Sequence, residues 1–525
     1  MIVPLNVNRL LKRTAAVYSD KVAVIDQDVR FTYQEMQRRV QRLSNALKSV
    51  GVEQGDRVAW LGYNNYPILE AYYGVTQFGA ILVPLNIRLL AEEIAAIIDD
   101  AEPKVLVFDS DFEPMARMIG QSRAIQLIEI QIAAAHNEYV GYEEWLSLAS
   151  DSEAGAEFDE NAPAEIFYTS GTTGNPKGVI LTHRNLYLHG LEVSSMLGSV
   201  GFNDASVLLH TIPLFHVNGW GSPHYVTALG ATHVMLRTFD PTTVFQLIEQ
   251  HKVTHANLVP TMVNMLISSP RVADFDLSSF RHVMVGGAPT PSSFIERAKE
   301  LMGIEVSGGY GMSETSPVVS IAVIKSTLKD AQEARKNQLQ GTAGIPLPGM
   351  EVSILNDDGQ HLEWNGSDVG ELAVRGNGVM QGYWNRPEET ASTFYDGWLL
   401  TGDMATIDPE GYIHIVDRKK DIIISGGENI SSAELEDVLY GHPAIAECCV
   451  IGRPSPEWGE IPHAVVVLRP NMTVTEDELT TYAAQHLARF KRIKSVQIVE
   501  SLPKTGTGKL QKRAVRQQYG GGWSS

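Results

Sequence analysis

The chain has 525 residues, of which 44% are hydrophobic and 20% charged, a composition typical of a globular protein longer than one ordinary domain. Its formal net charge of −20 argues against nucleic acid as a partner, although a locally basic site could still bind a small anion. No apolar run approaches the roughly 20 residues of a transmembrane helix. Neither end resembles a targeting signal, and the two adjacent cysteines, Cys448 and Cys449, predict buried thiols rather than a disulfide. We therefore expect a cytoplasmic protein.

Short apolar runs alternate with amphipathic stretches through most of the chain. Four runs predict buried strands and two stretches predict helices: 105–109, 206–212, 232–237 and 282–287 for the strands, 242–252 and 292–303 for the helices. This alternation indicates an α/β sheet covered on both faces. In such folds ligands bind beyond the carboxyl ends of the strands, where glycine-rich turns collect.

The pattern changes from about Gly341 onward. Three stretches, 349–360, 369–376 and 411–417, alternate apolar and polar residues and are broken by Gly, Asp and Asn, which is typical of short β-strands. After Asp417 a basic run precedes two βα patterns and a basic tail. We therefore predict a large domain over 1–416 and a separate small α+β domain over 417–525.

The stretch YTSGTTGNPKG, residues 168–178, follows an apolar run and concentrates hydroxyls, glycines and one lysine. It lacks the Gly-Lys-Ser/Thr ending of a P-loop, so its spacing excludes a P-loop nucleotide hydrolase. Its glycines still let the backbone approach an anion, and its hydroxyls and Lys177 can donate to phosphate oxygens. We predict a phosphate-binding loop, and the alternative is a glycine-rich turn with solvated hydroxyls.

Five motifs follow one another along the chain. They are YTSGTTGNPKG at 168–178, GYGMSET at 309–315, WLLTGDM at 398–404, DRKKDIIISGGENI at 417–430 and PKTGTGKLQKR at 503–513. Together they resemble the adenylate-forming (AMP-binding) superfamily, which contains acyl- and aryl-CoA synthetases, adenylation domains and beetle luciferases. The segment PLFHVNGW at 213–220 is similar to medium- and long-chain fatty-acyl-CoA synthetases. The resemblance implies an α/β fold with a large N-terminal domain of α/β subdomains, a small β-barrel-like subdomain, and a small mobile α+β C-terminal domain.

The resemblance also implies a reaction. The carboxylate of an acid attacks the α-phosphate of ATP in line and pyrophosphate leaves; the thiol of CoA then attacks the acyl carbon and AMP leaves. Both steps depend on positioning and charge neutralisation more than on a protein nucleophile. The implied partners are the carboxylic acid, ATP and CoA, with Mg²⁺ as the metal. Related fatty-acid enzymes are often homodimers, so a homodimer is one hypothesis for this chain.

Matching positions assign the phosphate, metal and catalytic contacts. The β- and γ-phosphates would lie against the loop residues Thr169, Ser170, Gly171, Thr172, Thr173, Gly174 and Lys177. Glu314 and the Thr169 hydroxyl would bind Mg²⁺, which prefers oxygen ligands; the alternative for Glu314 is a surface carboxylate or a helix cap. Lys509, on a glycine-flanked loop, would contact the α-phosphate and stabilise charge in the transition state. Its alternative is an ordinary residue of a solvated basic tail.

The nucleoside is assigned to a second group. Adenine would lie against small residues that let a flat ring approach the backbone, with one stacking tyrosine: Gly287, Ala288, Pro289, Gly309, Tyr310 and Gly311. Thr315 would offer a hydroxyl near the α-phosphate. Asp403 would accept the two ribose hydroxyls, and Arg418 would be a second ribose contact.

The acid and the thiol are assigned to two further segments. The acyl pocket would contain His216, Val217, Asn218 and Trp220, with His216 near the reacting carboxylate and Trp220 as a gate to an acyl tunnel. The alternatives are a structural histidine and a buried aromatic residue. Asp417 would be the hinge about which the C-terminal domain rotates between the half-reactions. Ser425, Gly426 and Gly427 would then line the thiol tunnel, since a narrow pantetheine arm needs backbone without side chains.

Several functions share these motifs. We favour a CoA ligase for a medium- or long-chain fatty acid, although a short-chain or aromatic acid would require the same motifs. A second hypothesis is an enzyme that loads a carrier protein instead of CoA, but no carrier domain is appended. A luciferase-like oxygenase would also keep the motifs. A non-catalytic binding relative would be expected to lack Lys509 or Glu314, and both are present.

Overall fold

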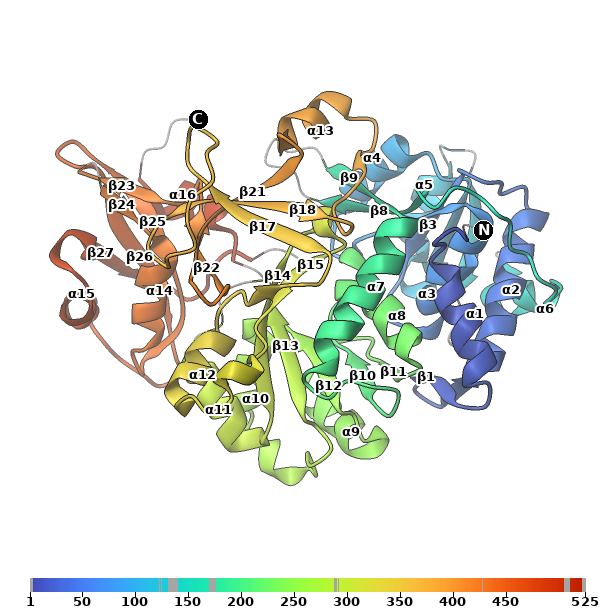
Figure 1. Cartoon of the computed structure of the whole chain (residues 1–525), viewed down its shortest axis with the longest axis horizontal. Helices are drawn as coiled ribbons and strands as arrows, with labels where there is room; N and C mark the ends of the chain where they lie inside the picture. The colour runs from blue at the N-terminus through green and yellow to red at the C-terminus, as the bar shows by residue number, and fades with distance from the viewer. Residues whose placement is uncertain are drawn as a thin grey trace.

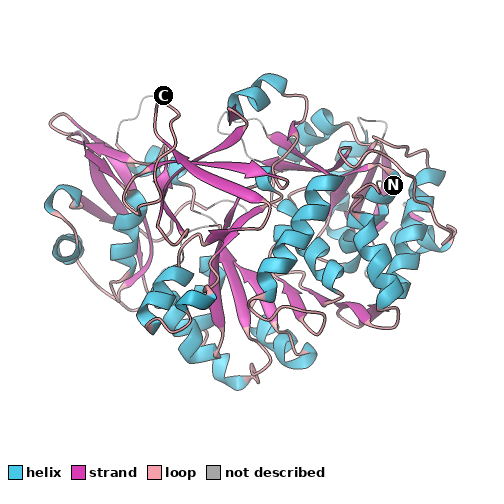
Figure 2. Ribbon diagram, viewed as in Figure 1, coloured by secondary structure: helices cyan, strands magenta, loops and turns pink. Residues whose placement is uncertain are grey.

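The computed structural model describes residues 3–121, 123, 125–130, 140–169, 176–287, 290, 292–426, 428–504 and 510–521. Over these residues the chain forms four β-sheets with helices packed between and around them (Figures 1 and 2). No helix in these ranges is both long and apolar enough to cross a membrane.

The largest sheet has nine strands in the order β16-β15-β14-β13-β12-β10-β11-β1-β2. The strands from β14 to β1 pair in parallel, while β2, β15 and β16 add antiparallel edges. The bounds are β1 Val22–Asp26, β2 Val29–Thr32, β10 Val207–His210, β11 Thr232–Met235, β12 His255–Leu258, β13 His282–Gly286, β14 Glu305–Gly311, β15 Val318–Ile321 and β16 Ile345–Pro346. The strands predicted at 206–212, 232–237 and 282–287 are therefore confirmed.

The second sheet has eight strands in the order β19-β9-β8-β4-β3-β5-β6-β7. The bounds are β3 Arg57–Leu61, β4 Ile81–Pro84, β5 Val105–Asp109, β6 Gln126–Ile130, β7 Val140–Gly141, β8 Pro163–Thr169, β9 Lys177–Thr182 and β19 Gly382–Tyr383. β8 and β9 form an antiparallel hairpin at the carboxyl end of β8. The strand predicted at 105–109 is β5.

Helices cover the outer faces of the two sheets and fill the space between them. They are α1 Asn8–Val17, α2 Tyr33–Ser49, α3 Tyr66–Gly74, α4 Ala91–Ala101, α5 Glu113–Gln121, α6 Tyr142–Ser147, α7 His183–Gly198, α8 Val217–Leu229, α9 Pro241–His251, α10 Pro260–Ile267, α11 Ser292–Met302 and α12 Glu333–Gln340. Figure 1 shows α7 and α8 at the centre of the molecule. On α7, Leu186 joins the core that contains Val179 of the eight-stranded sheet, and Val193 joins the core that contains Leu208 of the nine-stranded sheet. α7 is thus shared by both sheets.

The helix starts follow ordinary capping chemistry. The Asp240 carboxylate accepts a 2.9 Å hydrogen bond from the backbone N–H of Thr243, and Pro241 occupies the first position of α9. Thr182 and Asn185 cap α7 reciprocally. The helices predicted at 242–252 and 292–303 are confirmed as α9 and α11.

A five-stranded antiparallel sheet follows, which is the predicted small β subdomain. Its elements are β17 Met350–Leu355, β18 Gly370–Gly376, α13 Pro387–Thr393, β20 Phe394–Tyr395, β21 Trp398–Ile407 and β22 Ile413–Arg418. In Figure 1 this sheet lies between the α/β part and the C-terminal part. Asp417 lies near the end of its last strand, β22.

The C-terminal part has its own five-stranded sheet and its own core. Its elements are β23 Ile423–Ser425, β24 Glu428–Ile430, α14 Ser432–Tyr440, β25 Ile445–Ser455, β26 Gly459–Leu468, α15 Glu476–His486, β27 Ser495–Ile498 and α16 Lys512–Tyr519. Cys448 and Cys449 lie on β25, buried and with free thiols, as predicted. The boundary predicted between 416 and 417 stays a prediction.

Candidate active site

The predicted phosphate loop connects β8 to β9. β8 ends at Thr169 and β9 begins at Lys177, and these two residues lie opposite each other in the hairpin. The remaining loop residues of the prediction lie outside the described residues: Ser170, Gly171, Thr172, Thr173 and Gly174. Thr169 and Lys177 therefore flank the loop from two adjacent strands.

Lys177 lies beside an aromatic and acidic cluster. Its ammonium forms an ion pair with Glu389 and lies 5.4 Å from the centroid of the Tyr383 ring. The Tyr383 hydroxyl donates a 2.8 Å hydrogen bond to Oε1 of Glu314. Burial, followed by the charge of Glu314, raises the pKa of Tyr383, so this hydroxyl keeps its proton and remains a donor. Tyr383 thus links Lys177 to the predicted metal ligand.

Glu314 lies in a short 3₁₀ turn, Ser313–Thr315, directly after β14. Its residue is only 9% exposed, and its backbone carbonyl accepts a 2.8 Å hydrogen bond from the N–H of Met380. This burial argues against the alternative of a surface carboxylate. The neighbouring Thr315 directs its hydroxyl proton to backbone carbonyls, the nearer being Pro317 at 2.7 Å. In this arrangement the hydroxyl proton of Thr315 is therefore engaged by the backbone and is not directed at a phosphate.

The oxygen atoms of Glu314 and Thr169 suit a hard cation that binds together with the nucleotide. Among the described residues, no group of three or more His, Cys, Asp or Glu side chains could hold a metal ion. Glu314 supplies one carboxylate and Thr169 one hydroxyl, and the turn that carries Glu314 packs against β9. Mg²⁺ usually keeps several waters and takes one or two carboxylates together with substrate phosphates. The two residues fit that mode of binding.

Asp403, on β21, lies 2.6 Å from each of two donors. The Tyr310 hydroxyl donates to its Oδ2, and Nε of Arg418 pairs with its Oδ1. Asp403 and Arg418 face each other across β21 and β22, whereas Tyr310 comes from β14 of the nine-stranded sheet. The fold thereby brings together three predicted nucleoside residues from two different sheets.

The surroundings of Asp403 disfavour the ionised form of its carboxyl group. Burial raises the pKa of Asp403, and the charge of Arg418 and the hydroxyl of Tyr310 oppose that effect without cancelling it. Burial and the nearby carboxylate also raise the pKa of Tyr310, which therefore remains a donor. A buried carboxylate that is costly to ionise is better explained by ligand binding than by stability.

Backbone packs closely around the predicted adenine wall. Gly309 pairs with Gly286 across β13 and β14, and a Cβ on Gly311 would lie 1.8 Å from the carbonyl oxygen of Pro317. Gly287 has a φ of 81°, a conformation that favours glycine. Two further residues of this wall lie outside the described residues: Ala288 and Pro289.

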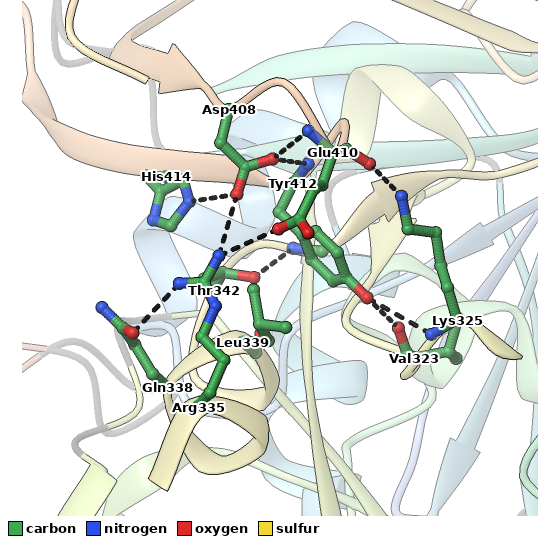
Figure 3. Close-up of polar contacts among 11 residues, drawn as sticks. Val323, Lys325, Arg335, Gln338, Leu339, Thr342, Asp408, Glu410, Tyr412 and His414 are labelled. Carbon is green, nitrogen blue, oxygen red and sulfur yellow. Dashed lines mark hydrogen bonds and ion pairs between the residues drawn. The ribbon is translucent and has the colours of Figure 1, made fainter. Parts of the chain in front are cut away.

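The turn between β21 and β22 is fixed by polar contacts with the nine-stranded-sheet part (Figure 3). Arg335, on α12, lies 2.9 Å from the carboxylate of Glu410 and 3.8 Å from that of Asp408. Oδ1 of Asp408 accepts hydrogen bonds from the backbone N–H groups of Glu410 and Tyr412, and the Tyr412 hydroxyl donates to the carbonyl of Val323 at 2.9 Å. These contacts hold the two strands that carry the ribose residues against the sheet that carries Tyr310.

The predicted acyl residues form the start of α8. His216 and Trp220 are half-buried, whereas Val217 and Asn218 are buried. A Cβ on Gly286 would lie 3.3 Å from the Trp220 ring, so the indole packs against the end of β13, beside the predicted adenine wall. Its role as a gate stays a prediction.

The predicted hinge residue contacts the C-terminal part directly. Oδ2 of Asp417 accepts a 2.7 Å hydrogen bond from the backbone N–H of Ser432 and a second from its hydroxyl. Lys512 donates to the same hydroxyl and pairs with Glu436 at 3.0 Å. Two predicted residues of this domain, Gly427 and Lys509, lie outside the described residues, while Ser425 ends β23 and Gly426 has a φ of 61°.

Two residues that shape the site were not predicted: Tyr383 and Arg335. Tyr383 meets Glu314 from 69 residues away, and Arg335 meets Glu410 from 75. Local periodicity carries no signal for contacts over such separations.

Comparisons with known proteins agree with this geometry. The chain matches the family model of the AMP-binding enzymes over residues 11–384, and the model of the AMP-binding enzyme C-terminal domain over residues 434–509. The first match spans more than half of the chain. The protein therefore belongs to the AMP-binding enzyme family, and its recognition as an adenylate-forming acyl-CoA synthetase is confirmed.

Its relatives include ligases for both aliphatic and aromatic acids. The long-chain-fatty-acid–CoA ligase of Thermus thermophilus is 38% identical over 522 residues, which are 98% of this chain and 96% of the relative. The feruloyl-CoA synthase of Amycolatopsis sp. is 38% identical over 509 residues, which are 97% of this chain and 98% of the relative. The crystal structure of ATP-bound MatB from Rhodopseudomonas palustris has a TM-score of 0.87 and 29% identity, covering 98% of this chain and 99% of MatB. The predicted fold class is confirmed.

Proposed function

We propose that the protein is an ATP-dependent acid–thiol ligase that activates a medium- or long-chain fatty acid as acyl-AMP and transfers the acyl group to CoA. The observation that carries the proposal is the cluster of Tyr310 and Arg418 around the buried carboxylate of Asp403, which joins two sheets. The similarity to the Thermus thermophilus ligase supports an aliphatic acid.

In the first half-reaction the carboxylate oxygen of the acid attacks the α-phosphorus of ATP, and pyrophosphate leaves. Asp403 accepts hydrogen bonds from the ribose and so fixes the nucleoside. Lys177 exchanges its ion pair with Glu389 for the β- and γ-phosphates, and Lys509 stabilises the charge that develops around the α-phosphate. His216 lies near the acid carboxylate, at the start of α8.

Glu314 and Thr169 are the residues that would bind Mg²⁺. The metal, when bound, supplies positive charge to the phosphate oxygens. The Tyr383 hydroxyl holds one oxygen of Glu314 and leaves the other oxygen for the ion or its waters.

In the second half-reaction the CoA thiol attacks the acyl carbon, and AMP leaves. The proposal includes rotation of the C-terminal domain about Asp417, which brings Ser425, Gly426 and Gly427 to the thiol and removes Lys509 from the phosphates. The contacts of Asp417 with Ser432 support this, because they tie the last strand of the small β subdomain to the first turn of α14. A homodimer and a cytoplasmic location complete the proposal, the latter supported by two free thiols on β25.

A second candidate is a CoA ligase for a hydroxycinnamic acid. It is favoured by one observation, the equal identity to the Amycolatopsis feruloyl-CoA synthase. ATP–pyrophosphate exchange across aliphatic and aromatic acids separates the two candidates, since only acids that reach the adenylate support exchange. Highest exchange with medium- and long-chain acids is expected, and exchange confined to aromatic acids would favour the second candidate.

A further inference from the structure

The first turn of α8 has a rare backbone conformation. Five consecutive residues, 217–221, have positive φ, with values of 42°, 42°, 56°, 65° and 80°. Three of them, Val217, Asn218 and Trp220, are not glycine, and residues with a Cβ avoid this left-handed region. Such a conformation persists only where the surrounding structure determines it, and it clusters at functional sites. Contacts from outside the turn must therefore hold it.

Glu165, on β8, provides such a contact. Nδ2 of Asn218 donates a 3.0 Å hydrogen bond to Oε2 of Glu165, while Oδ1 of Asn218 accepts one of 2.6 Å from the backbone N–H of Gly221 and closes the turn. The other carboxylate oxygen, Oε1, lies 2.9 Å from Nε2 of His224, further along α8. All three side chains have no exposed surface. A carboxylate presents two oxygens, so the Glu165 side chain contacts Asn218 and His224 at once.

The turn contacts two strands, β8 and β13, and each of them ends at a predicted nucleotide contact. Glu165 lies on the same strand as Thr169, the last residue before the phosphate loop. On the other side of the turn, Trp220 packs against Gly286 at the end of β13. Gly286 pairs with Gly309 of β14. A shift of β8 would therefore be transmitted to the indole through one buried carboxylate.

We propose that Glu165 is a positioning residue for acid binding. By holding Asn218 it fixes the left-handed turn, and the turn fixes the indole of Trp220 where the acyl chain enters under the proposed function, on which this inference rests. Glu165 itself does not touch a substrate. Its carboxylate lies on β8, the strand that ends at Thr169, and from there it fixes one wall of the acid site through Asn218.

Two variants and one control separate this role from a merely structural one. Asn218→Gly removes the link but suits the backbone, because glycine adopts left-handed φ freely. Glu165→Gln keeps the volume and one acceptor for Asn218, and its amide can donate to His224 after the imidazole changes tautomer. Thr14→Val removes a different buried hydrogen bond to α8, the 2.8 Å contact with the carbonyl of Thr227 near the other end of the helix.

The experiment measures pyrophosphate release by the full chain and its variants, varying the preferred acid at saturating ATP and then ATP at saturating acid. Asn218→Gly should raise KM for the acid about tenfold, because it removes both hydrogen bonds of the Asn218 side chain that fix the turn, the one to Glu165 and the one from Gly221. KM for ATP should change by less than about twofold, and Glu165→Gln should stay within about threefold of the wild type in both constants. Thr14→Val should lower the thermal midpoint and leave both constants unchanged.

Three outcomes would overturn the inference: an unchanged KM for the acid in Asn218→Gly, equal rises in both constants, or the same acid effect in Thr14→Val. A wild-type protein that releases no pyrophosphate with any acid would refute the proposed function, and the acid-positioning role with it. The two failures are distinguished by whether the wild type or only the variants deviate.

Discussion

Replacing Asp403 by asparagine should weaken ATP binding without weakening the fold. The asparagine keeps the shape and one acceptor oxygen, so Tyr310 can still donate to it, but the charge and the second acceptor are lost. A hydrogen bond to a charged group contributes about 1.5–3 kcal/mol. Loss of one such bond, about 2 kcal/mol, corresponds to a rise in KM for ATP of roughly 30-fold.

The stability of this variant follows from the direction of the pKa shift. Burial raises the pKa of Asp403 in the folded state, so the folded chain binds this proton more tightly than the unfolded chain. The carboxyl group therefore stabilises the fold only at low pH, and this contribution is lost as the pH rises through the folded-state pKa. At pH 7 the charge opposes folding, and Asp403→Asn should keep or raise the thermal midpoint.

Steady-state pyrophosphate release gives KM for ATP, and thermal denaturation at pH 7 gives the midpoint. Asp109→Asn is a matched control, because burial raises the pKa of Asp109 to about 6 and its carboxylate accepts hydrogen bonds from the Tyr63 N–H at 2.7 Å and from the Asn65 amide, outside the predicted nucleoside cluster. The control should leave KM for ATP unchanged. A midpoint lowered by more than about 5 °C in Asp403→Asn, with an unchanged KM for ATP, would show that Asp403 serves the fold and not the nucleoside.

Three further results are expected. Lys509→Ala should nearly abolish acyl-AMP formation but leave the thiolation of supplied acyl-AMP largely intact, and equal losses in both half-reactions would contradict domain rotation. Burial lowers the pKa of His189 and His282 to about 3 in the folded chain. The free energy of unfolding should therefore fall as the pH drops below the unfolded-state pKa of about 6.5, by about 2 kcal/mol per histidine at pH 5. A urea midpoint that stays constant from pH 7 to pH 5 would disprove this. Ser432→Ala removes the hydroxyl donor to Asp417 and should lower the free energy of unfolding by about 1–3 kcal/mol in urea; no change would show that water replaces the hydroxyl.

Local patterns were sufficient to predict individual elements. The helix predicted at 242–252 spans Pro241–His251, because a capping aspartate and a proline mark its start. The strand predicted at 105–109 has the same bounds in the structure, since a short apolar run fits a strand buried on both faces.

Contacts between distant residues could not be predicted in this way. Asp403 and Tyr310 are 93 residues apart, and only the resemblance of their motifs placed both at the nucleoside. The glycines of the sequence VNGWG allow a left-handed turn, but Val217, Asn218 and Trp220 gave no sign of one. The contacts that fix this turn come from β8, which no local pattern relates to α8.

The most direct test of the assignment is an analysis of the products formed from ATP and a single acid, with and without CoA. The acids tested range from acetate to stearate and include aromatic acids. Without CoA the protein should form acyl-AMP and pyrophosphate. With CoA it should form acyl-CoA and AMP continuously, at the highest rate for medium- or long-chain fatty acids. Rates that are equal for all acids and independent of CoA would contradict the assignment.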